Sequence, residues 1–222
     1  MRDIPEVKYS AGFVVRVAWA TLGILWLAVV ITGLTVLARY DRTPGVAAQP
    51  QARWPAGSQL ARDEERPTLV MLAHPRCTCT RASVAELAEL MARVRQRPRA
   101  YIVFIKPESM PDGWEQSDLW AAAHAIADVT VVRDERGLEA QLFGAETSGQ
   151  TFLYDADGRL LFSGGTTGAR GHQGDNPGRA ALVALINREG AAGSSTPVFG
   201  CSLFAPNDRD DATEVVSVSS RD

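Results

Sequence analysis

Short apolar runs alternate with helical patterns along most of the chain, from residue 68 to residue 189. Between the runs, Val84, Leu87 and Leu90 recur at the three- and four-residue steps that place side chains on one helix face. The pattern predicts strands over 68–73, 100–105, 129–132, 151–154 and 159–162, and helices over 82–94, 116–127, 137–143 and 177–188. Strands that alternate with helices and end in a hairpin predict an α/β fold, with helices flanking a mixed sheet.

The segment 17–37 contains no charged residue and is long enough to cross a bilayer. It has about 21 residues, against the roughly 20 that a transmembrane helix needs. A cleaved signal peptide is the alternative, although its apolar region is usually only about 7–15 residues long. Arginine and lysine are nearly balanced on the two sides, so the positive-inside rule decides little. We expect a single-pass signal-anchor with residues 1–16 in the cytoplasm, because most of the chain follows one early span.

The rest of the chain is divided by its composition. Residues 38–67 are rich in proline, glycine, glutamine and alanine and have no apolar period, so they are expected to be a linker. Residues 68–190 are the predicted folded domain, and residues 191–222 form a C-terminal extension with Cys201 and a polar tail. The net charge of −3 gives no indication of nucleic-acid binding.

Two of the three cysteines lie between the first predicted strand of the domain and the helix that follows it, in the order Cys77-Thr78-Cys79. The first N–H groups of a helix have no partner within the helix, and the helix dipole is positive at that end. Both effects favour the thiolate over the thiol. This position therefore predicts reactive thiols, with a pair of inert buried thiols as the alternative.

The strand–cysteine pair–helix arrangement resembles the thioredoxin-like superfamily. The segment Thr151-Phe152-Leu153-Tyr154-Asp155, with Gly158 in the following turn, also resembles a hairpin of its membrane-anchored extracytoplasmic branch, the TlpA/ResA-like thiol-disulfide proteins. The resemblance covers about residues 68–190. It implies a thioredoxin-like mixed sheet behind one transmembrane helix, and thiol-disulfide exchange with protein thiols and disulfides as partners and no cofactor. It also implies a bacterial inner-membrane protein whose C-terminal domain is periplasmic.

The chain departs from this family at two positions. It has C-x-C where the family has C-x-x-C, and the segment 148–151 lacks the proline that the family packs against its cysteines. In the family that proline shapes the substrate groove, so the resemblance assigns Gln150 and Thr151 to the groove. It is also thought to keep metals off the thiolates. Its absence favours an alternative function in copper or zinc binding, with His74, Cys77, Cys79 and Cys201 as the ligands.

Three cysteines leave more than one redox pairing open. A disulfide between Cys77 and Cys79 would close a small, strained ring, and strained disulfides are more oxidising. Alternatively, Cys201 is the true partner, because the Pro, Gly and apolar residues of 196–201 could dock on the domain. All three cysteines are therefore candidate catalytic residues. A third class of function is a non-enzymatic assembly factor that uses the fold only as an interaction surface.

A glycine-rich loop, residues 164–179, follows the predicted hairpin. It lacks the Lys-Ser/Thr ending of a phosphate-binding loop and follows an antiparallel strand, so nucleotide binding is not indicated. In a thioredoxin-like sheet the second hairpin strand ends at the edge that carries the cysteines. We therefore expect Arg170 and His172 to line the substrate groove, with an irregular surface loop as the alternative.

Overall fold

The computed structural model describes residues 11–189 and 193–204 of the chain. The chain divides into two units, Met1–Asp41 and Arg42–Asp222, and each is considered by itself. The first ten residues and the polar tail from residue 205 lie outside the described residues, so the predictions for them stay predictions.

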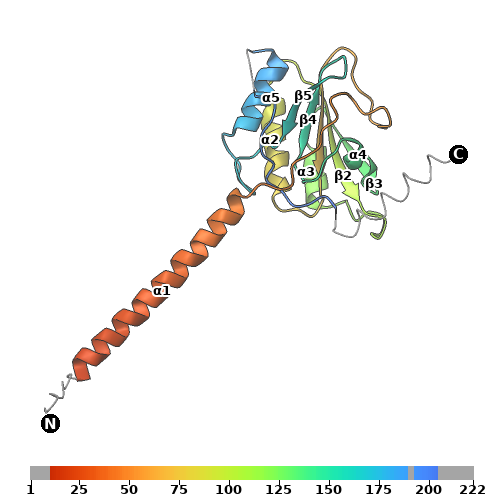
Figure 1. The fold of residues 1–222 in the computed structure, drawn as a ribbon. Coiled ribbons are helices and arrows are strands. Elements are labelled where there is room, and N and C mark those ends of the chain that lie inside the picture. Colours follow the sequence, from red (N-terminus) through yellow and green to blue (C-terminus); the bar gives the residue numbers. More distant parts are fainter. Residues whose placement is uncertain (1–10, 190–192, 205–222) are drawn as a thin grey trace, which may run out of the picture. The chain divides into compact units, whose positions relative to one another are not determined.

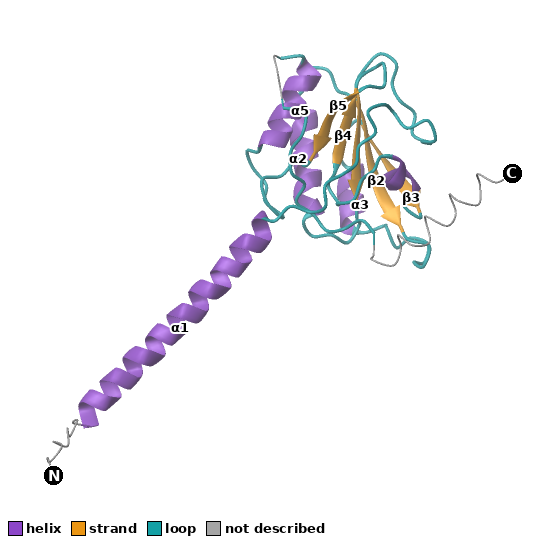
Figure 2. Cartoon of the chain, viewed as in Figure 1, coloured by secondary structure: helices purple, strands orange, loops and turns teal. Residues whose placement is uncertain are grey.

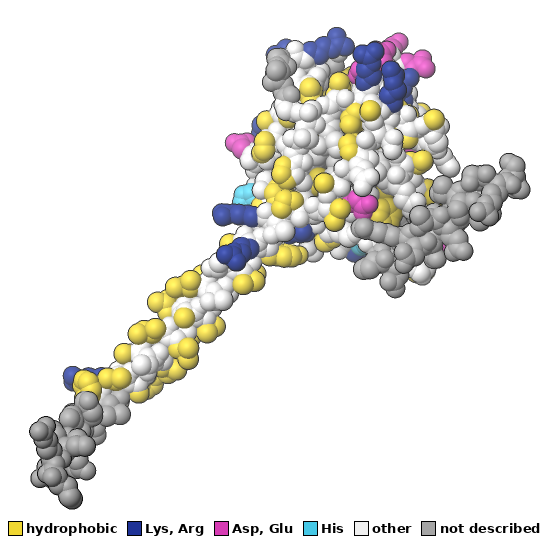
Figure 3. Space-filling view, viewed as in Figure 1, with side chains coloured by type: hydrophobic (Ala, Val, Ile, Leu, Met, Phe, Trp, Pro, Cys, Tyr) yellow, Lys and Arg dark blue, Asp and Glu magenta, His cyan; other side chains and the backbone are white. Residues whose placement is uncertain are grey.

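The first unit consists of helix α1 (Ala11–Arg42) (Figure 1). Hydrophobic side chains run along its length (Figure 3), as the exposed Trp19, Trp26 and Ile24 illustrate. Among the described residues it is the one helix that is long and apolar enough to cross a membrane. A membrane span and a signal sequence both satisfy this criterion. The span predicted over 17–37 lies inside α1.

The second unit is built on a five-stranded sheet in the order β3-β2-β1-β4-β5. Its parallel half is β1 (Thr68–Ala73), β2 (Arg99–Lys106) and β3 (Val129–Glu135), and its antiparallel half is β4 (Thr151–Tyr154) and β5 (Leu160–Gly164). The predicted mixed α/β sheet is confirmed. Strand β3 continues three residues beyond the predicted 129–132, because Arg133–Glu135 stay paired with the end of β2 despite being polar.

Both faces of the sheet are buried, which explains why β1 reads as an unbroken apolar run. Leu69 and Met71 face one hydrophobic cluster, and Val70 and Leu72 face another. The first cluster is covered by α2 (Thr80–Arg93), α3 (Asp118–His124) and α5 (Pro177–Asn187), as Figure 2 shows. The short α4 (Leu138–Leu142) contributes to the second cluster and is too small to cover that face alone.

The segment predicted to be a linker, residues 38–67, packs in part on the domain and supplies the missing cover. Leu60 is buried in the second cluster, and Trp54 packs edge-on against Phe143 and Tyr154 with ring centroids 5.2 and 5.3 Å apart. Backbone N–H groups of Gln49 and Trp54 donate to carbonyls of the domain. Proline and glycine exclude regular secondary structure here, but a few aperiodic apolar side chains suffice to hold the segment on the sheet.

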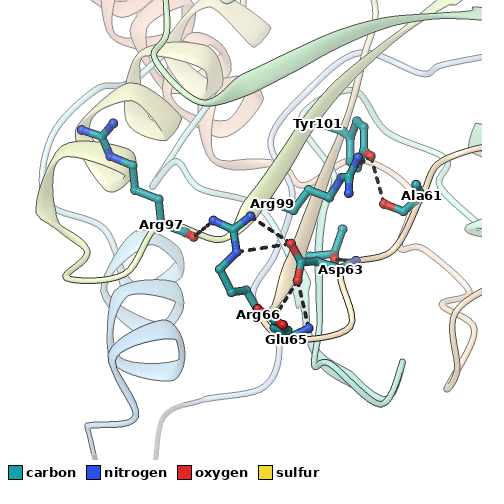
Figure 4. A network of polar contacts seen from close by, with 8 residues as sticks. Ala61, Asp63, Glu65, Arg66, Arg97, Arg99 and Tyr101 are labelled. Carbon is teal, nitrogen blue, oxygen red and sulfur yellow. Dashed lines mark hydrogen bonds and ion pairs between the residues drawn. The ribbon is translucent and has the colours of Figure 1, made fainter.

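A polar network fixes the end of this segment just before β1 (Figure 4). The Asp63 carboxylate accepts hydrogen bonds from the backbone N–H groups of Glu65 and Arg66 and pairs with the Arg66 guanidinium. These backbone hydrogen bonds, with a smaller contribution from Arg66, lower the pKa of Asp63 to about 2. Arg66 also donates to the carbonyl of Arg97, which links the segment to the turn before β2.

Replacing Trp54 with alanine is expected to lower the free energy of unfolding by about 2 kcal/mol, because the half-buried indole loses two edge-on ring contacts and leaves a cavity. Arg53→Ala is the matched control, since the exposed neighbouring side chain should change stability by less than about 0.5 kcal/mol. Thermal unfolding of the full chain in detergent, followed by circular dichroism, measures both. Equal stabilities would mean that the segment is only loosely attached.

Candidate functional site: three thiols at the start of helix α2

The turn between β1 and α2 holds two cysteines. The backbone N–H of Cys77 donates to the carbonyl of His74, and that of Thr80 donates to the carbonyl of Cys77, both at 3.1 Å. Cys79 is the residue that caps α2, already in a helical backbone conformation and without a side-chain cap. The Cys77 side chain is buried, with 5% of its surface exposed, whereas Cys79 is half-buried.

The third cysteine reaches the same place through a segment that we call the C-terminal strap, residues 194–203. The N–H of Ser163 in β5 donates to the carbonyl of Ser194 in the strap. The N–H of Ser148 donates to the carbonyl of Cys201, and the N–H of Leu203 donates to the carbonyl of Glu146. The strap also places Val198 and Leu203 in buried positions. A segment of this composition, predicted to be able to dock on the domain, does so.

Docking of the strap brings three sulfur atoms together. The Sγ atoms of Cys77 and Cys201 are 2.8 Å apart and hydrogen-bonded. The Sγ atoms of Cys77, Cys79 and Cys201 all lie within 4.8 Å of one another, close enough to exchange disulfide bonds or to share one thiophilic metal ion. Cys201 is the most exposed of the three residues.

The environment makes the three thiols unequal. Burial alone raises the pKa of Cys77, but hydrogen bonds with Cys201 and Thr80 outweigh it, so that the pKa is lowered. Burial and the neighbouring Cys77 raise the pKa of Cys79, and the Arg170 guanidinium opposes this. Burial and the hydrogen bond with Cys77 raise the pKa of Cys201 to about 12. Cys77 is therefore the thiol that most readily ionises.

The other predicted metal ligand lies apart from this group, because His74 is not among the residues whose ligand atoms meet. Its Nδ1 accepts a hydrogen bond from the backbone N–H of Arg76, and its ring packs edge-on against Trp114 at 5.4 Å. Burial, followed by the charge of Arg76, lowers its pKa. The set that could hold a metal is thus three sulfurs, without the imidazole.

The glycine-rich loop contributes one side chain to the site. The Arg170 guanidinium is near enough to Cys79 to oppose the rise in the pKa of its thiol, and it donates to the carbonyl of Gly200, the residue before Cys201. His172 is exposed, and its backbone N–H donates to the carbonyl of Ala169. The structure thus brings Arg170 to the thiols and shows no contact between His172 and them.

Gln150 and Thr151, the residues assigned to the groove, are buried. Gln150 is 1% exposed, its amide donates to the Ser163 hydroxyl, and its backbone carbonyl accepts from Leu72 of β1. Thr151 is the first residue of β4 and Gln150 directly precedes it, and both are too buried for a partner protein to reach their side chains directly.

Ser148 and Thr80 are residues of the site that the sequence reading missed. The Ser148 hydroxyl accepts from the backbone N–H of His74 at 2.7 Å and is hydrogen-bonded to the Thr80 hydroxyl at 2.5 Å. The Ser148 N–H donates to the carbonyl of Cys201. Ser148 therefore joins the cysteine turn to the strap. The signal for it in the sequence is the segment 148–151, which has Ser148 and lacks the family's proline.

No family model and no curated protein matches the sequence. Solved structures do match. A hypothetical protein from Sinorhizobium meliloti is 22% identical, with a TM-score of 0.51 over 72% of this chain and 93% of its own. An uncharacterized conserved protein from Geobacillus kaustophilus is 21% identical, with a TM-score of 0.52 over 75% and 94%. An exposed lipoprotein thioredoxin from Streptococcus pneumoniae is 13% identical, with a TM-score of 0.42 over 56% and 86%.

At these identities the similarity concerns the fold alone. The parallel β1–β3, the antiparallel β4–β5 hairpin, and the cysteines at the turn between the central strand and α2 define a thioredoxin-like domain. The chain combines this domain with one N-terminal apolar helix.

Proposed function

We propose that the protein is a thiol-disulfide oxidoreductase that exchanges disulfides with protein thiols. The observation that carries the proposal is the convergence of three cysteine Sγ atoms within 4.8 Å at the N-terminal end of α2. An inert structural cysteine has no need of two sulfur neighbours. The lowered pKa of Cys77 supports the proposal, because the thiolate is the attacking and the leaving species in exchange.

The chemistry requires Cys77 and one of the two other cysteines, Cys79 or Cys201. In the oxidised protein they share a disulfide. A partner thiolate attacks one of its sulfurs, forms a mixed disulfide and releases the other as a thiolate. A second partner thiol then breaks the mixed disulfide, so that two electrons pass from the partner dithiol to the protein. The reverse sequence reduces a partner disulfide, and no bound cofactor is required.

We place this activity on the extracytoplasmic side of a bacterial inner membrane, in the periplasm, with α1 as an uncleaved anchor. The length and composition of α1 support a span. An oxidising compartment also suits the chemistry, because disulfides persist outside the cytoplasm. The resemblance of the cysteine turn and the hairpin to TlpA/ResA-like proteins also supports a membrane-anchored, extracytoplasmic location.

The proposal is tested by purifying the full chain in detergent without oxygen and equilibrating it in glutathione buffers of graded redox potential. After alkylation, intact mass gives the number of free thiols at each potential. We expect a single reversible step of two thiols. Thiols that resist alkylation until a chelator is added would instead identify a copper- or zinc-binding protein. Three thiols that react independently at all potentials would rule out a redox couple and leave the assembly-factor alternative.

A further inference from the structure

We propose that the redox disulfide joins Cys77 to Cys201, and that Cys201 on the C-terminal strap is the sulfur that meets the partner protein. This inference rests on the proposed function and deepens it, because it assigns the two sulfurs of the couple their roles. It also assigns Cys77, the first cysteine of the motif, the role of the buried resolving thiol.

The geometry favours the Cys77–Cys201 pair over the pair within the motif. The two sulfurs are already 2.8 Å apart, and a disulfide requires about 2.05 Å, so a small side-chain movement suffices. Cys77 and Cys79, in contrast, lie in a turn that already makes the helix-like Cys77–Thr80 and Cys79–Ala82 backbone hydrogen bonds. Their sulfurs also lie within 4.8 Å of each other, but a bond between side chains only two positions apart would close a small, strained ring at the start of α2.

Accessibility decides which sulfur a partner meets. Cys77 is 5% exposed, whereas Cys201 is an exposed residue on the strap. A macromolecular thiolate can therefore approach the disulfide from the side of Cys201. The unequal pKa values agree with an attack on Cys201. The thiol with the lower pKa is the better leaving group, and that thiol is Cys77.

The exchange balances in two steps. A thiolate of a protein dithiol attacks Cys201 Sγ; the Cys77–Cys201 bond breaks, the partner–Cys201 bond forms, and Cys77 leaves as a thiolate. The second thiol of the partner, once deprotonated, attacks the partner's first sulfur in the mixed disulfide. The partner's own disulfide forms, the partner–Cys201 bond breaks, and Cys201 leaves as a thiolate that takes up a proton. The partner is oxidised by two electrons and the protein is reduced. A second, more oxidising protein disulfide reverses the sequence and restores the bond.

The strap contacts suit this role, because they hold Cys201 in place while its sulfur changes partners. The Ser148 N–H binds the carbonyl of Cys201, and Arg170 binds the carbonyl of Gly200. Both contacts are made through the backbone and are independent of the sulfur. The Cys77 thiolate thus stays within reach of Cys201 Sγ in the mixed disulfide and can displace the partner from it.

The experiment compares the full chain in detergent with Cys77→Ser, Cys79→Ser and Cys201→Ser. In the oxidised wild type, alkylation followed by peptide mapping without reduction should recover the peptide that holds Cys77 and Cys79 joined to the Cys201 peptide, and fragmentation should place the alkyl group on Cys79. This result does not depend on the folding of any variant. Cys79→Ser should keep the two-thiol step, and Cys201→Ser should lose it. With glutathione disulfide as the probe, the double variant Cys77→Ser/Cys79→Ser should accumulate a glutathione adduct on Cys201, because no neighbouring thiol remains to resolve it.

A two-thiol step that maps to Cys77 and Cys79 would overturn this inference and leave the proposed function standing. Absence of any reversible step in the wild type would overturn the proposed function itself. A glutathione adduct that forms on Cys77 of Cys79→Ser/Cys201→Ser as fast as on Cys201 of Cys77→Ser/Cys79→Ser would contradict the assignment of the partner-facing sulfur.

Discussion

Replacing Gly200 with alanine is expected to weaken the Cys77–Cys201 disulfide roughly 5- to 150-fold, the equivalent of about 1–3 kcal/mol of overpacking. A Cβ atom on Gly200 would lie 1.9 Å from the backbone carbonyl oxygen of Ser148, a separation that real Cβ atoms do not show. Ser148 cannot give way easily, because its hydroxyl binds the cysteine turn and the next residue, Gly149, donates to Leu72 of β1. The strap must move instead, and Cys201 is its next residue.

Gly168→Ala is the matched control for this variant. Gly168 lies in the glycine-rich loop, outside the left-handed region, and a Cβ there would meet nothing within 4 Å. Intact mass gives the fraction of protein that carries the disulfide at fixed ratios of reduced to oxidised dithiothreitol. This fraction yields the equilibrium constant of the disulfide for the wild type, Gly200→Ala and Gly168→Ala. Thermal unfolding shows whether the domain of Gly200→Ala stays folded. A folded Gly200→Ala protein with the wild-type constant would mean that the strap does not position Cys201.

The parts of this fold that the sequence predicts are those with strong local patterns. Strand β1 has an unbroken apolar run, α2 has a three- and four-residue period, and Asp155 to Gly158 has the residues of a turn. Each of these elements was predicted to within a few residues. The attachment of residues 45–60 to the sheet has no such pattern. It depends on Trp54 and Leu60, two apolar side chains with Pro55 and Gly57 between them and no repeating apolar period.

The same distinction applies to the site. The placement of two cysteines at the start of a helix is local, and it was read directly from the chain. The 2.8 Å contact between Cys77 and Cys201 joins residues 124 positions apart, and no period or spacing encodes it. The sequence left three pairings open for this reason. Arg170 is an intermediate case, since the order of the strands indicated its loop but not which of its side chains would face the thiols.

The glycine-rich loop is attached to α2 through a buried ion pair, and breaking this pair is the second change with a large expected effect. Glu86 and Arg179, 2% and 6% exposed, form the pair between α2 and α5. The same carboxylate accepts from the N–H of Gly174 at 2.7 Å and from the amide of Asn176 at 3.1 Å. One acidic side chain thus joins two helices and the end of the loop that carries Arg170.

Glu86→Gln is expected to lower the free energy of unfolding by about 3 kcal/mol, because it leaves the Arg179 guanidinium buried without its main counter-charge. Glu89→Gln, on the same helix, is the control. Its pair with Arg93 spans 3.6 Å between side chains that are both more than half exposed, and such pairs contribute about 0–1 kcal/mol. Thermal unfolding of the full chain in detergent separates the two. A loss below 1 kcal/mol for Glu86→Gln would mean that the pair contributes no more than a surface one.

The redox couple supplies a second readout for Glu86→Gln that a purely structural role would not change. Loosening Gly174 and Asn176 frees the loop end next to Arg170, and Arg170 is the side chain that binds the carbonyl of Gly200. A freer Arg170 holds Cys201 less firmly against Cys77, so the disulfide should become easier to reduce in Glu86→Gln and stay unchanged in Glu89→Gln. Less stable protein with an unaltered disulfide equilibrium would show that contacts other than Arg170 hold the strap, and that this part of the glycine-rich loop does not position Cys201.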